Sequence, residues 1–409
     1  MKAKLGDICI INQASLSKQD QVSEILYLDT SSVTEGMIGM PLPISKNNAP
    51  SRAQRKVKDK TILYSLVRPN LKHYGILSAP AKNLIVSTGF ATIDVKDTNE
   101  ILPEYLYYLL TQEHITNYLH GIAQNAVSAY PSLSSDDLSD LVLEFPPIEQ
   151  QKAVARLLGT IDQKISLNKA INHNLEALAK QLYDYWFVQF DFPDDNGRPY
   201  KSSGGKMVWN EKLKREIPEG WKVESIFTAL DIQYGFPFST ELFNDEGEGV
   251  PVVRIRDIID NTISAYSTEK VDERYHLAKG DLLIGMDGNF HMNVWADNNA
   301  YLNQRSVRIR GLANSAVSVL QAKFSLSPYI KAKEQRAKGS TVGHLSDKDL
   351  KELYILVPSS TLLREILDNI LSEIIANREN ILSLTKQRDE LLPLLMNGQV
   401  SVNYDLSND

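Results

Sequence analysis

The chain has 409 residues, of which 43% are hydrophobic and 23% charged, and its formal net charge is −7 at pH 7. This length allows two or three globular domains, and the lack of any run of eighteen apolar residues argues against a membrane-spanning helix and a membrane partner. Cys9 is the only cysteine, which excludes an internal disulfide and a cysteine-based zinc site and favours a cytoplasmic location. The acidic total argues mildly against nucleic acid as a partner, although a binding face needs only a local excess of positive charge.

The first 145 residues show the patterns of a mixed domain of short strands and a few helices. The opening segment, MKAKLGDICIINQ, lacks the apolar region of a secretion signal. Lys60–Asn70 is typical of a short buried strand that runs into a turn, and Asn83–Val95 also favours β-structure. Leu102–Ala123 carries apolar residues at helical spacing, which predicts a helix.

Lys152–Phe187 predicts one helix of about ten turns. Its apolar residues have the alternating 4-3 spacing of a coiled-coil seam in two stretches: Val154, Leu158, Ile161 and Ile165, and then Ile171, Leu175, Leu178 and Leu182. A cluster of aromatic residues ends the helix: Tyr183, Tyr185, Trp186, Phe187 and Phe190. We interpret this cluster as an anchor for the helix end, with a docking surface for a partner subunit as the alternative.

Asn168 and Asn172 interrupt the apolar stripe between Ile165 and Ile171. A buried asparagine in a coiled-coil seam lowers stability but fixes the register of the two helices. The alternative is that both asparagines face solvent, and the sequence does not decide between the two.

Asp191–Trp221 follows the helix and is rich in Pro, Gly, Ser and Asp, which predicts a connector with little core of its own. After a second globular stretch, Leu362–Leu395 again has the pattern of a long amphipathic helix. Its apolar stripe consists of Ile366, Ile370, Ile374, Ile381, Leu384, Leu391 and Leu395.

The chain contains an internal repeat. Pro131–Pro147 (PSLSSDDLSDLVLEFPP) recurs as Gly343–Ser359 (GHLSDKDLKELYILVPS), directly before the second long helix. Lys60–Asn70 has a weaker counterpart in Gly280–Phe290. The identical positions are Leu133, Ser134, Asp137, Leu138, Leu141 and Pro146, which match Leu345, Ser346, Asp349, Leu350, Leu353 and Pro358. The same order of elements in both halves indicates duplication of a domain followed by a helix.

Two seams of this kind predict that the long helices pair with each other. A helix nearing 60 Å, at about 1.5 Å per residue, is longer than a domain of about 150 residues is wide. The alternative is two amphipathic helices, each packed on its own domain.

Two stretches carry a family resemblance. Residues 145–191 (FPPIEQQKAVARLLGTIDQKISLNKAINHNLEALAKQLYDYWFVQFD) resemble the central conserved region of the specificity subunits of Type I restriction-modification systems. Gly197–Trp221 (GRPYKSSGGKMVWNEKLKREIPEGW) resembles the linker typical of one branch of that family. With the duplicated layout, the resemblance covers essentially the whole chain, although the two target-recognition halves match only in pattern.

The resemblance implies an α+β fold. Two similar mixed α/β target-recognition domains would be joined by two long antiparallel helices that form a coiled coil, in a pseudo-two-fold internal repeat. The implied boundaries are 1–145 and 221–358 for the target-recognition domains, 146–190 and 359–398 for the long helices, 191–220 for the linker and 399–409 for a tail.

The resemblance also implies a non-catalytic DNA-reading subunit. Each target-recognition domain would read one half of a bipartite site in double-stranded DNA, and the coiled coil would set the spacer between the halves. Two methyltransferase subunits would dock on this scaffold, joined by restriction (translocase) subunits. No cofactor is expected in this chain, since S-adenosylmethionine would belong to the methyltransferase, and ATP and Mg to the motor-nuclease. The helix starts, PPIEQQKAVARLL and PSSTLLREILDNI, differ, so the two arms need not contact their methyltransferases equivalently.

The sequence lacks the motifs that catalysis would require. Pro146–Pro147 is not flanked like the loop with which amino-methyltransferases hold a flipped base, and Ser202–Met207 lacks two positions of a phosphate-binding loop. Asp162–Lys164 superficially matches half a nuclease metal site, but a solvated helix face is the preferred explanation. The seven histidines show no metal-ligand spacing. We therefore predict no catalytic and no metal-binding residues.

A local cluster of positive charge marks the first half of the chain. Its basic residues are Arg52, Arg55, Lys56, Lys58, Lys60, Arg68 and Lys72, and Asp59 is the one acidic residue in this run. Such a cluster would neutralise phosphates and release counterions. A solvated face is the alternative.

The second half offers two further groups of DNA-binding candidates, and two equivalent loops, one in each half, offer a third. Lys333, Arg336 and Lys338 lie in a basic run, and Arg305, Arg308 and Arg310 are expected to alternate along a strand and so to share one face, toward the DNA groove. Arginine is the best candidate for reading bases, because its fork bonds guanine O6 and N7 together. The loops 123–134 and 338–346 occupy equivalent places in the two copies, where Tyr130 and His344 could reach a base edge; a plain turn before a helix is the alternative.

Two other classes of function remain open. A duplicated coiled-coil adapter could hold protein partners without binding DNA, and the steep salt dependence of phosphate contacts would separate it from a DNA-binding protein. An enzyme with diverged motifs would transfer labelled methyl groups from S-adenosylmethionine to DNA as an isolated chain.

Overall fold

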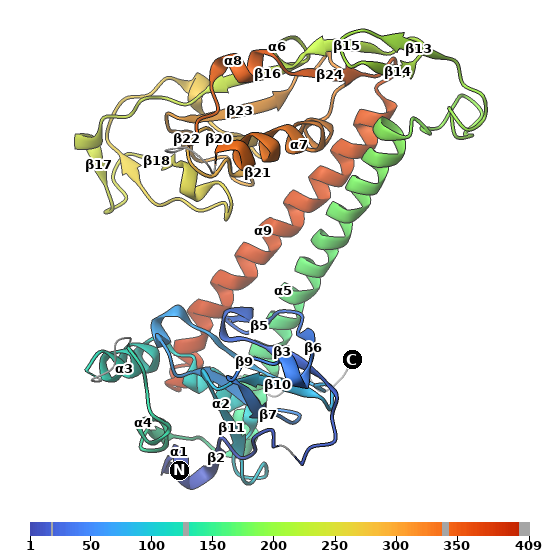
Figure 1. Cartoon of the computed structure of the whole chain (residues 1–409). Helices are drawn as coiled ribbons and strands as arrows, with labels where there is room; N and C mark the ends of the chain where they lie inside the picture. Colours follow the sequence, from blue (N-terminus) through green and yellow to red (C-terminus); the bar gives the residue numbers. More distant parts are fainter. Residues whose placement is uncertain (18, 126–130, 338–342, 401–409) are drawn as a thin grey trace, which may run out of the picture. The chain divides into compact units, whose positions relative to one another are not determined.

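The computed structural model describes residues 1–17, 19–125, 131–337 and 343–400. The chain forms two compact units. The first contains residues 1–164 together with those from 384 onward, and the second contains residues 165–383. Each unit therefore combines one globular domain with one end of each long helix (Figure 1).

The first domain is built on two four-stranded sheets. One is antiparallel throughout, in the order β2 (Cys9–Ile11), β11 (Phe90–Val95), β8 (Ile62–Ser65) and β9 (Tyr74–Ile76). The other has the order β6 (Leu42–Ser45), β3 (Glu24–Leu28), β10 (Leu84–Ser87) and β7 (Ala53–Lys56), with β3 and β10 parallel. Two smaller pairs join β1 (Lys2–Lys4) to β12 (Val142–Glu144) and β4 (Val33–Thr34) to β5 (Met37–Ile38). The expected β-structure at 83–95 is confirmed.

The helix predicted over Leu102–Ala123 is two helices, α2 (Pro103–Leu110) and α3 (Glu113–Gln124). Gln112 separates them with an extended backbone, at φ −59° and ψ 142°. α2 is buried almost all round, whereas α3 buries one face only. The break allows the two helices to take different orientations, which one straight helix could not do. α1 (Leu5–Ile8) and α4 (Ser135–Ser139) complete the domain.

The second domain repeats this plan. Its first sheet, again antiparallel, has the order β16 (Leu230–Tyr234), β23 (Ser306–Gly311), β20 (Leu282–Gly285) and β21 (Met292–Val294). Its second sheet has the order β17 (Phe243–Asn244), β19 (Tyr266–Ser267), β18 (Val250–Val253) and β22 (Tyr301–Leu302). The helices are α6 (Ile226–Ala229), α7 (Val319–Ala337) and α8 (Asp347–Lys351), and β15 (Lys222–Ser225) pairs with β24 (Tyr354–Val357). The first sheets match strand for strand, while the second sheets are ordered differently.

The repeated sequence around α4 and α8 forms the same joint in both domains. Each helix begins with a capping box, in which the serine hydroxyl accepts from the N–H of an aspartate three residues on: Ser134 and Asp137 at 3.1 Å, Ser346 and Asp349 at 3.2 Å. The aspartate side chain accepts from the serine N–H in return. A strand and then a long helix follow in each copy, so the duplication predicted from the sequence is confirmed here.

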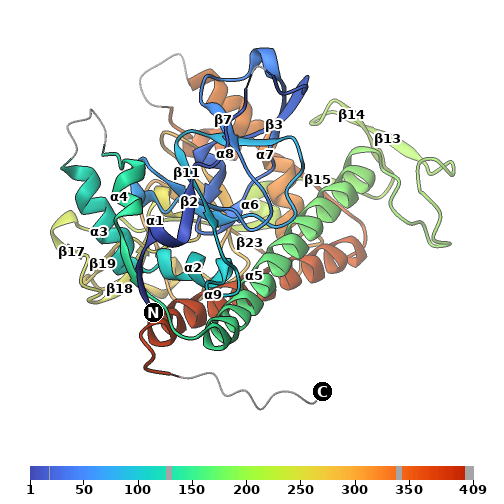
Figure 2. The same cartoon turned by 90° about the horizontal axis from the view of Figure 1, so that it is seen from below.

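The two long helices, α5 (Ile148–Tyr183) and α9 (Leu362–Met396), lie side by side and antiparallel (Figures 1 and 2). In the first unit, Leu158 near the start of α5 and Leu395 near the end of α9 share one apolar core. In the second unit, Ala179 and Leu367 do the same with the opposite ends. The predicted pairing is confirmed, and a π-helical turn at Asp184–Val188 continues α5.

The seam of α5 differs from the predicted one. Ile171 and Leu178 are 37% and 44% exposed, so their assignment to the seam was wrong. Asn172 is buried instead, and its amide donates to the carbonyl oxygen of Ile374 at 3.1 Å. The inward positions keep the heptad spacing without interruption through Ile161, Ile165, Asn168, Asn172, Leu175, Ala179 and Leu182. The alternative that Asn172 faces solvent is therefore wrong, and Asn168 is half-buried.

The connector contains more structure than predicted. A hairpin of β13 (Met207–Asn210) and β14 (Arg215–Pro218) lies within it, and Ile217 and Trp221 belong to the core of the second domain. The aromatic residues at the end of α5 pack into the same core, with ring centres of Phe187 and Phe190 at 5.5 and 5.8 Å from that of Trp221. Their interpretation as an anchor is confirmed, although Tyr185 stays 38% exposed.

Candidate nucleic-acid interface

The seven basic candidates of the first domain lie in the turn before β7, on β7, in the loop before β8 and around the 3-10 turn Pro69–Leu71. Acidic residues from other parts of the domain pair with several of them, which lowers the local excess of positive charge below that expected from the run alone. The ion pairs are Lys56–Asp20 at 2.5 Å, Lys58–Asp94 at 3.9 Å, Lys60–Glu104 at 2.9 Å and Lys72–Glu35 at 3.1 Å.

The cluster keeps exposed cationic side chains of both kinds, among them Lys58 and Lys72. Arg52 and Arg68 are exposed, whereas Arg55 is half-buried on β7. Arg68 and Lys72, on either side of the 3-10 turn, have left-handed backbones with φ of 49° and 54°. Large side chains rarely adopt this conformation, and such residues concentrate at functional sites.

The three arginines around β23 do not share one face. Arg305 precedes the strand and has a left-handed backbone with φ of 61°, so the expected alternation was wrong for this residue. Arg308 and Arg310 do lie on one side of β23, but acidic partners on β16 and just before β20 hold them. Arg308 is 5% exposed and forms an ion pair with Asp231. Arg310 is half-buried and holds both carboxylate oxygens of Asp281, at 2.6 and 2.7 Å.

Burial and neighbouring charges shift the pKa values of these two arginines in opposite directions. Burial, together with the neighbouring charge of Arg310, lowers the pKa of Arg308. The hydrogen bonds to Asp281 raise the pKa of Arg310. Both guanidinium groups thus serve as interior ion-pair partners in this structure, and either would have to leave its partner to reach a base.

Lys333, Arg336 and His344 lie near the joint before α8. Lys333 donates to Asp349 of the capping box at 2.6 Å, while Arg336 is exposed at the end of α7. Burial alone would raise the pKa of Asp349, but hydrogen bonds from Lys333 and from Ser346 outweigh it and lower the pKa to about 2. Two other candidates, Tyr130 and Lys338, lie outside the described residues.

Arg305 and His344 meet at one carboxylate. Nη1 of Arg305 donates to one oxygen of Asp287 at 2.6 Å, and Nδ1 of His344 lies 2.6 Å from the other. Burial would raise the pKa of Asp287, but these two hydrogen bonds outweigh it and lower the pKa. Asp287 was not among the predicted residues, because an acidic side chain is not itself expected to bind DNA.

The start of each long helix is fastened to its own domain by one polar side chain. In the first unit, the side chain of Gln151 is buried and bonds the loop before α2. It accepts from the N–H of Leu102 at 2.9 Å and donates to the carbonyl oxygens of Glu100 and Pro146 at 3.0 and 2.9 Å.

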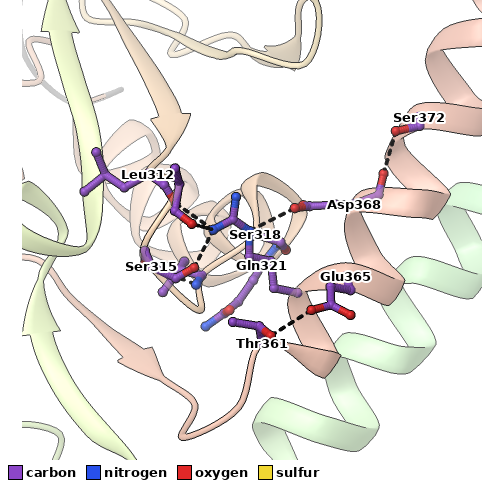
Figure 3. Close-up of polar contacts among 11 residues, drawn as sticks. Leu312, Ser315, Ser318, Gln321, Thr361, Glu365, Asp368 and Ser372 are labelled. Carbon is purple, nitrogen blue, oxygen red and sulfur yellow. Dashed lines mark hydrogen bonds and ion pairs between the residues drawn. The ribbon is translucent and has the colours of Figure 1, made fainter.

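Arg364 has this role in the second unit, and its partners Leu312, Ser315 and Asp368 are labelled in Figure 3. It donates to the carbonyl oxygen of Leu312 at 2.6 Å and to that of Ser315, and it bonds Asp368 one turn further along α9 at 3.0 Å. The sequences of the two helix starts differ, as noted above. Even so, α5 is attached to the loop before α2, and α9 is attached to the loop before α7.

The paired helices also carry an ion pair in each unit. Asp162 of α5 bonds Arg388 of α9 at 3.2 Å and accepts from the hydroxyl of Tyr108 at 2.6 Å in the first unit. Glu176 bonds Arg378 at 3.0 Å in the second. The expectation that Asp162 lies on a solvated face was therefore wrong, because its carboxylate joins both helices to α2.

The described part of the chain shows neither a metal-binding cluster nor a membrane-spanning helix. No group of three or more His, Cys, Asp or Glu side chains there is arranged to hold a metal ion. None of the helices described is both long and apolar enough to cross a lipid bilayer.

Comparison with known proteins identifies the family. The model of the Type I restriction modification DNA specificity domain matches residues 1–177 and again residues 218–390. The chain therefore belongs to the Type I restriction-modification specificity-subunit family, and the matched regions follow the two copies of the repeat. The resemblance first seen in the helix and linker is confirmed.

Individual relatives cover most of the chain. It is 27% identical to the Type I restriction enzyme MjaIX specificity subunit of Methanocaldococcus jannaschii, with 86% of this chain and 83% of that protein aligned. It is 24% identical to the HindI specificity subunit of Haemophilus influenzae, over 86% and 89% of the two chains. The crystal structure of the S subunit of a Type I system from M. genitalium has a similar fold, with a TM-score of 0.57, 15% identity and coverage of 97% and 95%.

Proposed function

We propose that this chain is the non-catalytic DNA-reading subunit of a Type I restriction-modification complex. Each of its two domains would read one half of a bipartite site in double-stranded DNA. The duplicated fold carries this proposal: two family domains share one first-sheet topology and one joint to a long helix, but differ in their second sheets. Shared framework with locally different surfaces is what two related reading domains with different targets require.

The paired helices would set the spacer between the half-sites. At about 1.5 Å per residue, the 36 residues of α5 extend roughly 54 Å. Seven extra residues in each helix, inserted between 164 and 165 and between 383 and 384, would preserve the heptad spacing and add about 10 Å. Since DNA rises about 3.4 Å per base pair, we expect the unread gap to grow by roughly three base pairs.

The test is to map methylated adenines in cells that carry this chain and its methyltransferase. A bipartite motif is the expected result, and the lengthened helices should change its gap while both half-sites stay the same. The control places the same seven residues in the exposed turn at 195–197 of the connector, where the gap should not change. Altered half-sites with an unaltered gap would overturn the spacer role.

Methyltransferase subunits would dock on the helices, and motor-nuclease (restriction) subunits would join them. An exposed apolar stripe on α5 supports such docking, formed by Leu167, Ile171, Leu178 and Tyr185. Combined Ile171→Glu and Leu178→Glu substitutions should abolish copurification with the methyltransferase, while His173→Glu, at an exposed position of the same helix outside this stripe, should not. We assign S-adenosylmethionine to the methyltransferase and ATP with Mg to the motor-nuclease, so the isolated chain should transfer no labelled methyl group to DNA.

A protein adapter without DNA binding is the competing function. Affinity of the assembled complex for DNA should fall by orders of magnitude between 50 and 200 mM salt if six to ten phosphates are contacted. A complex that holds its partners but shows no salt-sensitive DNA binding would favour the adapter.

A further inference from the structure

Two short segments of the first domain, one after β8 and one before α4, pair through their backbones. The N–H of Arg68 donates to the carbonyl oxygen of Pro131 at 3.0 Å. The N–H of Leu133 donates to the carbonyl oxygen of Leu66 at 2.8 Å. We call these paired segments, residues 66–68 and 131–133, the platform of the first domain.

The second domain has an equivalent platform, made of the segments after β20 and before α8. The N–H of Gly288 donates to the carbonyl oxygen of Gly343 at 3.0 Å, and the N–H of Leu345 to that of Met286 at 2.8 Å. The two platforms thus share their hydrogen bonds as well as their place in the repeat. They can be compared residue by residue.

This comparison shows that an arginine changes place between the copies. The third residue of the first segment is Arg68 in one platform and Gly288 in the other, both left-handed, with φ of 49° and 69°. The first residue of that segment donates its N–H to the carbonyl oxygen of Gly89 in one domain and of Arg305 in the other, at 2.8 Å each. We count this bonded residue, Gly89 or Arg305, as part of its platform, so each platform carries one exposed arginine and one glycine, at exchanged positions.

Packing helps to explain why the positions are exchanged. A Cβ atom at Gly89 would lie only 2.9 Å from the methyl carbon of Thr30, so the first domain leaves little room for an arginine there. In the second domain, the side chain of Arg305 is 64% exposed. Both arginines lie on strained left-handed backbone, a conformation that persists where the surrounding structure or function requires it.

We propose that the platform is the base-reading site of each domain, with Arg68 and Arg305 as the reading side chains. Each guanidinium fork would bond O6 and N7 of a guanine in the major groove, one in each half-site. This inference rests on the proposed function and adds to it the residue and the base. Among the three arginines around β23, the side chain of Arg305 is the most exposed, at 64%, against 6% for Arg308 and 37% for Arg310.

Asp287 is the positioning residue of the second platform. Its carboxylate holds Arg305 on one oxygen and His344 on the other, which fixes the long arginine side chain before DNA arrives. Ordering such a side chain in advance lowers the entropy lost on binding. The first platform has Val67 and Ser132 at the places of Asp287 and His344. Of the two platforms, the second therefore has this positioning carboxylate and the first does not.

The experiment exchanges residues between the copies. Arg68→Gly gives the first platform the residue that the second has at that place, and Arg305→Gly does the reverse. Glycine adopts left-handed backbone freely, so neither variant should disturb the fold. Each is assembled with the host methyltransferase, and both the methylated motif and DNA affinity are determined.

We expect each glycine variant to lose discrimination at one guanine, in one half-site only, by roughly 5- to 150-fold. Arg305→Lys should lose the same discrimination while keeping the salt dependence, because the charge remains and the fork does not. Asp287→Asn should weaken binding by roughly 2- to 10-fold, with relaxed reading confined to the half-site of the second domain. Arg198→Ala in the connector is the control and should change neither half.

Two outcomes would overturn the proposal. In the first, the variants fold, bind and methylate the parent motif with both halves unchanged, so the platforms do not read bases although the chain still directs methylation. In the second, the parent complex neither binds DNA nor directs methylation, and the proposed function fails with the inference.

Discussion

Asn172 and Ile374 face each other across the two long helices, and the asparagine amide donates to the isoleucine carbonyl oxygen at 3.1 Å. The side chain is buried, and its own carbonyl oxygen has no hydrogen-bond partner among the described residues. Such a group costs about 1–3 kcal/mol when it is left unsatisfied. Since it is the buried polar residue of a seam whose other members, apart from the half-buried Asn168, are apolar, we interpret it as serving the register of the pair at the expense of stability.

Asn172→Leu should therefore raise the free energy of unfolding, by roughly 1 kcal/mol. Denaturant unfolding monitored by circular dichroism measures the change. Asn174→Leu, two residues away on the exposed face, is the matched control and should stay within about 0.5 kcal/mol of the parent. A less stable Asn172→Leu protein would contradict this account of the seam.

Asp162→Asn should destabilise the first unit. The change removes the negative partner of Arg388, whose side chain is 20% exposed, and weakens the bond from Tyr108. We expect the free energy of unfolding to fall by about 1–3 kcal/mol. This is less than for a fully buried ion pair, because water still reaches both groups. Glu390→Gln, which affects an exposed pair with Lys386, should have almost no effect on the same unfolding curve. Equal effects of the two substitutions would be inconsistent with the role given to Asp162.

Asp349 should make the second domain sensitive to acid. Its pKa is about 2, below the ordinary value for an aspartate, so its ionised form stabilises the fold. That contribution is complete above about pH 4 and is lost as the pH falls toward 2. Asp349→Asn should lower stability by about 1–2 kcal/mol at pH 7 and flatten the dependence between pH 4 and 2. Glu352→Gln, at an exposed position, is the control and should show the same dependence of unfolding free energy on pH as the parent. If Asp349→Asn also kept the parent's loss of stability between pH 4 and 2, the stabilising role of the Lys333–Asp349 ion pair would be contradicted.

Arg308 and Asp231 should respond asymmetrically to substitution. Burial lowers the pKa of Arg308, so an apolar residue of similar length fits its site without a charge to desolvate. Arg308→Met should stay within about 1 kcal/mol of the parent and leave DNA affinity unchanged. Asp231→Asn leaves the buried cation unpaired and should cost about 2–3 kcal/mol, while Asp245→Asn on the surface serves as control. Loss of DNA affinity in a stable Arg308→Met protein would restore Arg308 as a DNA contact.

Much of the fold could be predicted because the repeat preserves residues that local structure requires. A capping box needs a serine and an aspartate at fixed spacing, so the joints before α5 and α9 were recognisable without any structure. The heptad seam was predictable only in part. Hydrophobicity favoured Leu178, but the heptad spacing that continues from Ile161 through Asn172 places Ala179 inward instead.

The candidate site was harder to predict, because ion pairs form between residues that are distant in the chain. Asp231 on β16 and Asp281 just before β20 bind the arginines of β23, and no pattern within β23 indicates this. The platforms were hidden for the same reason. Arg305 and His344 were singled out separately, but the carboxylate that joins them comes from the turn after β20.

Leu395, 2% exposed, packs in the core of the first domain with Leu5 and Leu158. On the ribosome, the strands of that domain emerge long before this leucine does. At 5–20 residues per second the delay is roughly 10 to 50 s. The domain translated first is therefore the one that matures last, and a nascent chain stopped within α9 would leave apolar surface open near its beginning rather than near the break.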